Sequence, residues 1–76
     1  MRYELYEGPI SEFEDLYIDV IYYSTDDKDE MASAMFKYMA DYYDDSTNAD
    51  EVLTVLDRET GKYMMPSEFM KTVSKN

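Results

Sequence analysis

Acidic side chains are the residues of this sequence with the most chemistry to offer: its 76 residues include 18 Asp and Glu, and neither His nor Cys. A carboxylate pair such as Glu12 and Glu14 can act as general acid and base when the environment separates the two pKa values. That separation needs a desolvated cleft, for which a domain of this length has little room. No serine has a histidine to activate it. The sequence therefore predicts a protein that is not an enzyme.

A calcium loop is the metal site to test against the acidic clusters. An EF-hand loop needs oxygen ligands at positions 1, 3 and 5, a glycine at position 6 and a glutamate at position 12. Counting from Asp44, Ala49 and Val55 stand where the glycine and the glutamate are required. The pattern predicts a solvated loop, with weak divalent-ion binding at Asp44, Asp45 and Asp50 as the minor alternative. We expect no cofactor and no dedicated metal site.

Charge is segregated along the chain. Residues 1–57 hold 16 carboxylates against three basic residues, whereas residues 58–76 hold two carboxylates against four. The net charge of −11 costs self-repulsion on folding, so it serves either solubility or a basic partner. Such a surface is repelled by anionic lipid and by bare nucleic acid. With no apolar run of membrane-spanning length and no signal peptide, we expect a cytoplasmic protein that contacts neither directly.

Apolar periodicity in the first half predicts two strands and a long helix. Residues 3–6 indicate a short strand, which Gly8 and Pro9 end. Residues 16–23 alternate with both faces largely apolar, the pattern of a central strand. Capping oxygens and an apolar stripe at helical spacing then predict a helix over residues 26–43.

The second half predicts a hairpin and a short helix. Residues 52–56 and 62–65 read as strands, and Gly61 suits a positive-φ position in the loop between them. Pro66 opens the last helix. The order β-β-α-β-β-α predicts one α+β domain over residues 1–76. In it, an antiparallel sheet of about four short strands carries the main helix and the C-terminal helix on one face.

Two surfaces are candidates for partner contact. The first combines acids around the main helix with tyrosines, which offer large amphipathic contact area. Some of its acids lie at the helix C-terminus, where the helix dipole disfavours them. It comprises Asp26, Asp27, Asp29, Glu30, Asp41, Tyr42, Tyr43, Asp44, Asp45, Asp50 and Glu51. The second surface is an apolar cluster in the non-acidic part, with core packing as the alternative: Tyr63, Met65, Phe69 and Met70.

The density of charge favours a phosphate-like surface. About 30 Å of B-DNA carries roughly eighteen phosphate charges, and residues 1–57 carry a net charge of −13. The first hypothesis is therefore a non-enzymatic inhibitor whose acids block a basic nucleic-acid-binding site on another protein. The second is a small adaptor that contacts a partner, or itself as a homodimer, through the C-terminal apolar cluster.

In its size, acidity and lack of cysteine, the chain resembles small proteins with which bacteriophages neutralise host nucleic-acid enzymes. These include DNA-mimic restriction inhibitors and anti-CRISPR proteins. The resemblance rests on composition and size, and no motif transfers residue by residue. It implies a counter-defence inhibitor that acts in the cytoplasm of a host cell.

Self-repulsion predicts a marginally stable monomer whose melting temperature rises with moderate salt. Raising the ionic strength from about 0.01 M to about 0.15 M shortens the screening length from ~30 Å to ~8 Å, which weakens repulsion between exposed like charges. Thermal unfolding followed by circular dichroism measures the effect. A melting temperature that falls with added salt would show instead that attractive pairs dominate.

Overall fold

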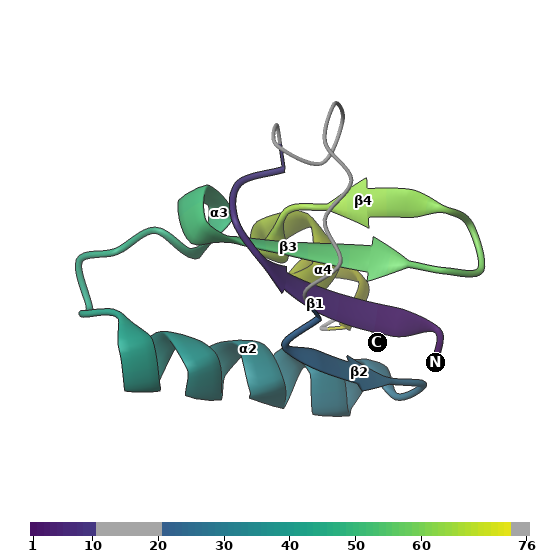
Figure 1. Cartoon of the computed structure of the whole chain (residues 1–76), viewed down its shortest axis with the longest axis horizontal. Helices are drawn as coiled ribbons and strands as arrows, with labels where there is room; N and C mark the ends of the chain where they lie inside the picture. Colours follow the sequence, from purple (N-terminus) through teal and green to yellow (C-terminus); the bar gives the residue numbers. More distant parts are fainter. Residues whose placement is uncertain (11–20, 74–76) are drawn as a thin grey trace.

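The computed structural model describes residues 1–10 and 21–73 and has a four-stranded antiparallel sheet at its centre (Figure 1). The strands are β1 (Tyr3–Glu7), β2 (Tyr23–Thr25), β3 (Leu53–Asp57) and β4 (Lys62–Met64). Their order across the sheet is β2-β1-β3-β4, so β1 is paired on both sides. The protein is a small α+β structure, which confirms the fold class predicted from the sequence.

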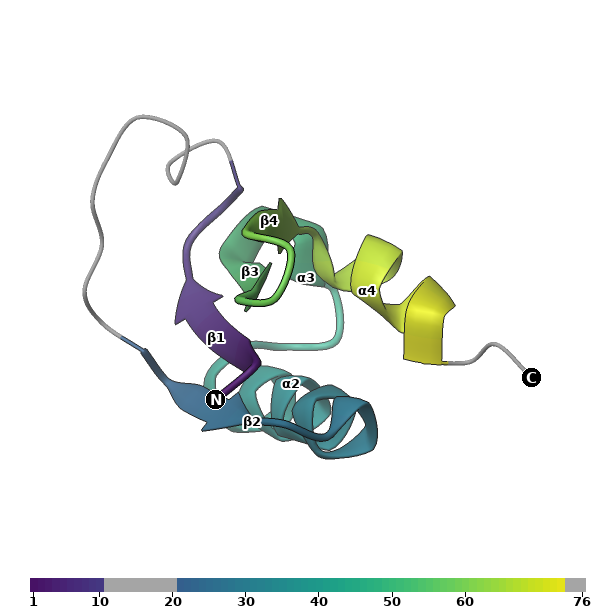
Figure 2. The ribbon, with the colours of Figure 1, turned by 90° about the vertical axis from the view of Figure 1, so that its right-hand side faces the viewer.

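The described helices are α2 (Lys28–Tyr42), α3 (Ala49–Val52) and α4 (Pro66–Val73). Figure 2 shows α2 and α4 on the same side of the sheet, whereas α3 is a single turn that leads directly into β3. Asn48 caps α3 by accepting a hydrogen bond from the backbone N–H of Asp50 at 3.0 Å. The sequence predicts a loop at this turn, because four residues are too few to show a periodicity.

The core lies between the sheet and the two longer helices. From the sheet it takes Leu5 and Val55, which are partners in the β1–β3 register. From the helices it takes Met31 and Phe69, neither of which is exposed to solvent. The ring of Phe69 meets that of Tyr3 edge-on, with 5.5 Å between the ring centroids. The C-terminal helix is thus tied to the first strand.

The opposite face of the sheet carries a polar network. The Tyr6 hydroxyl donates to the Glu4 carboxylate at 2.9 Å, and the Arg58 guanidinium lies 3.0 Å from the same carboxylate. Tyr6 also packs with Leu56, and the half-buried Tyr63 packs against this pair. Glu4 is buried, and these two contacts replace the water that it loses on folding.

The strand predicted over residues 16–23 is corrected in one respect. Residues 16–20 lie outside the described residues, but Tyr23 opens β2, which lies at the edge of the sheet formed by the described strands and not at its centre. Strands β1 and β3 hold the centre of the described sheet. Tyr22 and Tyr23 are exposed, and their hydroxyls bond to Glu7 and Glu30. These two tyrosines contributed to the apolar pattern from which a central strand was predicted, although their polar ends keep them at the surface.

The main helix is confirmed, with Asp27 as its N-cap. Its buried stripe is narrower than the sequence indicated: Met31, Ala32 and Met35 are buried, whereas Phe36 and Tyr42 are 66% and 70% exposed. The short sheet contacts only one side of the helix. The hairpin is also confirmed, with Gly61 at a φ of 73°.

Replacing Phe69 with alanine should leave much of the protein unfolded. Phe→Ala in a core costs ~3–5 kcal/mol, which is about the whole stability expected of a chain of this size. Urea unfolding followed by circular dichroism tests this, with Phe36→Ala as the matched control. The exposed Phe36 site should change stability by about 0.5 kcal/mol or less. Equal effects of the two substitutions would contradict the assignment of Phe69 to the core.

Candidate partner-binding surface

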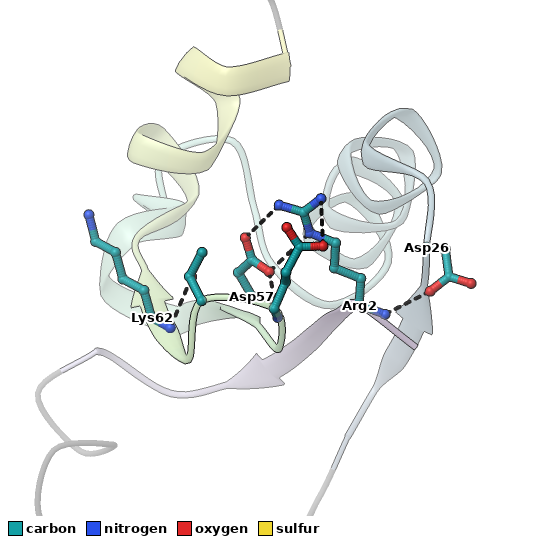
Figure 3. Close-up of polar contacts among 6 residues, drawn as sticks. Arg2, Asp26, Asp57 and Lys62 are labelled. Atoms are coloured by element: carbon teal, nitrogen blue, oxygen red, sulfur yellow. Dashed lines mark hydrogen bonds and ion pairs between the residues drawn. The ribbon is translucent and has the colours of Figure 1, made fainter.

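Three acids at the start of α2 have structural roles. The Asp27 carboxylate caps the helix by accepting from the N–H groups of Asp29 at 2.8 Å and Glu30 at 3.4 Å. Glu30 accepts from the Thr25 hydroxyl at 3.1 Å. Asp26 accepts from the backbone N–H of Arg2 at 2.8 Å (Figure 3). These contacts tie the helix N-terminus to β1 and β2.

Arg2 also joins the first strand to the end of β3, as Figure 3 shows. Its guanidinium donates to both oxygens of Asp57 at 3.1 Å and lies 3.4 Å from Glu59. The hydrogen bond from Arg2 is the main cause of a lowered pKa for Asp57. Arg58 and Lys62 likewise pair with Glu4 and Glu68. Both arginines of the chain are therefore engaged away from α2, and the basic residues on α2 itself are Lys28 and Lys37.

Two acids beyond the C-terminus of α2 hold turns and caps. One Asp44 oxygen accepts from the hydroxyls of Ser46 at 2.7 Å and Thr47 at 3.0 Å, which lowers the pKa of Asp44. Asp50 accepts from the backbone N–H of Ser67 at 2.8 Å and from its hydroxyl at 2.6 Å. Since Ser67 lies in the first turn of α4, Asp50 caps that helix from a distant segment.

The other predicted acids have no such role. The side chains of Asp29, Asp41, Asp45 and Glu51 are exposed and make no hydrogen bond or ion pair with any described residue. We call these four the free acids. Residues 31–40 contain no acid, so Asp29 and Asp41 stand about 18 Å apart along α2. The acids form groups at the two ends of the helix instead of one continuous row.

Glu7, which sequence reasoning missed, gathers tyrosines from distant parts of the chain. Its carboxylate accepts from the hydroxyls of Tyr22 at 3.0 Å, Tyr38 at 3.0 Å and Tyr43 at 2.8 Å. These three hydrogen bonds lower the pKa of Glu7, and the bond from Tyr43 has the largest effect. The same bond raises the pKa of Tyr43 to about 12, and burial raises that of Tyr38 well above its usual range. In the sequence, the abundance of tyrosine was the only sign of this cluster around Glu7.

A groove of about 540 Å³ lies beside this cluster, between β2 and α2. The Tyr38 ring packs against those of Tyr22 and Tyr42, with centroid distances of 4.9 and 4.7 Å. We call the site the tyrosine groove; its polar and aromatic lining is Tyr22, Tyr23, Asp29, Glu30, Ser33, Lys37, Tyr38, Asp41 and Tyr42. It brings together Asp29, Glu30, Asp41 and Tyr42 from the predicted acidic surface, whereas Tyr43 bonds to Glu7.

The predicted C-terminal cluster does not form one surface. Phe69 is in the core, and Tyr63 packs on the opposite face of the sheet, because alternation along β4 points it away from Met64. Met65 is 38% exposed. Met70 is half-buried and lines a second groove, of about 500 Å³, with Phe36 and Met39. We call this the α2–α4 groove.

Comparisons with protein-family models, curated proteins and solved structures found no match. Within residues 1–10 and 21–73, no three acidic side chains are placed to hold a metal ion. None of the helices described is long and apolar enough to cross a membrane. The function is therefore inferred from the geometry of the acidic and aromatic surfaces.

The Glu7 carboxyl should titrate below its ordinary pKa, because three hydroxyls bond to its charged form. Tyr43→Phe should raise this pKa toward the ordinary value, and Tyr42→Phe, which removes no bond to Glu7, should not. The stabilising effect of these bonds is then complete above the ordinary pKa of 4.5 and lost as the pH falls through the lowered one. Carbon-detected NMR titration of the side chain measures this. Equal pKa values in the two variants would contradict the hydrogen-bonded cluster.

Proposed function

We propose that the protein is a non-enzymatic inhibitor that binds a basic nucleic-acid-binding site on another protein through the acidic surface around α2 and α3. The main support is the presence of the four free acids. Each adds repulsion to a chain of net charge −11 and forms no bond within the described structure. Contact with a Lys- or Arg-lined site would relieve that repulsion.

The dimensions of α2 are compatible with this role. A helix of 15 residues is about 22 Å long, which matches about six base-pair steps of B-DNA. Acids at its two ends would stand in for phosphates at the two ends of such a segment. In size and composition, this function fits a counter-defence protein of anti-restriction or anti-CRISPR type, acting in the host cytoplasm.

The α2–α4 groove supports a second candidate function. Phe36 is 66% exposed beside it, and Met39, Met70 and Pro66 add apolar lining. A small adaptor would bind a partner or a second copy of the chain here. Its contact would resist salt, because burial of apolar surface is not screened.

Neutralising Asp29, Asp41 and Asp45 together as asparagines should weaken partner binding by about 3- to 160-fold, taking ~0.2–1 kcal/mol for each exposed pair. The partner is first captured from a lysate at low salt and released by salt or duplex DNA. The affinities of the parent protein and of the variant for the purified partner are then compared. Asp44 stays unchanged because it holds a turn.

The matched control carries glutamate at the same three positions and keeps the charge. It should bind nearly as the parent protein does. An asparagine variant that binds as tightly as the parent would contradict the proposal. A salt-resistant contact that Phe36→Ser removes would favour the adaptor.

A further inference from the structure

We propose that the tyrosine groove binds arginine side chains from an extended basic segment of the partner. This inference rests on the proposed function and names the chemistry that the acidic surface would recognise. Arginine is favoured because a planar guanidinium both stacks on aromatic rings and pairs with carboxylates.

The groove offers aromatic surface that the fold does not use. Tyr22, Tyr23 and Tyr42 are 43%, 40% and 70% exposed, although each lines the groove. Tyr42 rests on Tyr38, at 4.7 Å between ring centroids, and leaves most of its own surface open. Tyr22 and Tyr42 both pack on the half-buried Tyr38 ring, and their exposed faces form a surface on which a flat cation can stack.

These rings are held in place before any ligand arrives. The Glu7 carboxylate accepts hydrogen bonds from the hydroxyls of Tyr22 and Tyr38, and the Tyr38 ring packs against that of Tyr42. Tyr23 is held by its hydroxyl bond to Glu30 at 3.4 Å. Fixed rings lower the entropy lost on binding, which is a general source of affinity in preorganised sites.

The charge of the groove complements a basic guest. Asp29, Glu30 and Asp41 line it, against one cation, Lys37, which forms no ion pair in the part of the chain described. Asp29 and Asp41 lie about 18 Å apart along α2. That length fits five or six residues of extended chain at ~3.3 Å each. Alternate side chains of such a segment would face the groove.

The test uses three blocked pentapeptides with serine at positions 2 and 4 and with arginine, lysine or citrulline at positions 1, 3 and 5. Each is titrated into the 15N-labelled protein at low salt and followed by amide chemical shifts. The arginine peptide should shift amides of β2 and of the groove side of α2. It should bind about two- to fivefold more tightly than the lysine peptide, because the planar guanidinium can stack flat on a ring and pair with a carboxylate through two N–H groups. The uncharged citrulline peptide should bind least.

Variants at two exposed aromatic positions of α2 separate stacking from charge. Tyr42→Leu should weaken arginine-peptide binding about two- to fivefold, whereas Tyr42→Phe keeps the ring and should bind as the parent does. Phe36→Leu is the matched control, because Phe36 is 66% exposed on the same helix but lines the other groove. Tyr42 makes no bond to Glu7, so the cluster beneath it stays intact.

The possible failures are distinct. Equal binding of the arginine and lysine peptides, unaffected by Tyr42→Leu, would overturn the arginine groove. The proposed function would stand in that case if the asparagine variant still lost its partner. Shifts confined to the α2–α4 groove would also overturn the inference. Chemical shifts of the groove amides that change with protein concentration in the absence of peptide would also overturn it. They would assign the groove to a second copy of the chain.

Discussion

A small apolar core has to hold together a chain of net charge −11, and the other features of the structure depend on that constraint. The core joins the central strands to α2 and α4 through side chains such as Leu5, Met31 and Phe69. Several acids then stabilise the fold around it. Asp27 caps α2, Asp50 caps α4, and Asp57 binds Arg2 across the sheet. Within residues 1–10 and 21–73, the acids are thus of two kinds, those with a structural role and those without one.

The proposed function follows from that division. The free acids lie around α2 and α3, and two of them, Asp29 and Asp41, line the tyrosine groove. Neither acidity nor tyrosine content alone would indicate a binding site, because exposed acids serve solubility and aromatic rings serve cores. Their combination in one groove, over rings that Glu7 holds in place, gives the surface both charge and shape.

Local patterns predicted most of the fold, since a helix cap, a glycine turn or a strand alternation is set within a few residues. The role of each acid was not predictable, because it depends on tertiary contacts. Asp50 caps a helix that begins 16 positions later, and the tyrosines on Glu7 come from 15 to 36 positions away. The two phenylalanines illustrate the same limit: both fit an apolar helical stripe, yet Phe69 is buried and Phe36 is exposed.

Carboxyl labelling of the complex with its captured partner tests the central claim most directly. Carbodiimide coupling of an amine, read by mass spectrometry, reports which carboxylates solvent can reach. The account predicts that the partner protects Asp29, Asp41, Asp45 and Glu51 from labelling. Glu59 and Glu68, which pair with Arg2 and Lys62, should label equally in the free and bound protein. Unchanged labelling of the four free acids, with protection only at Glu68 on α4, would contradict it.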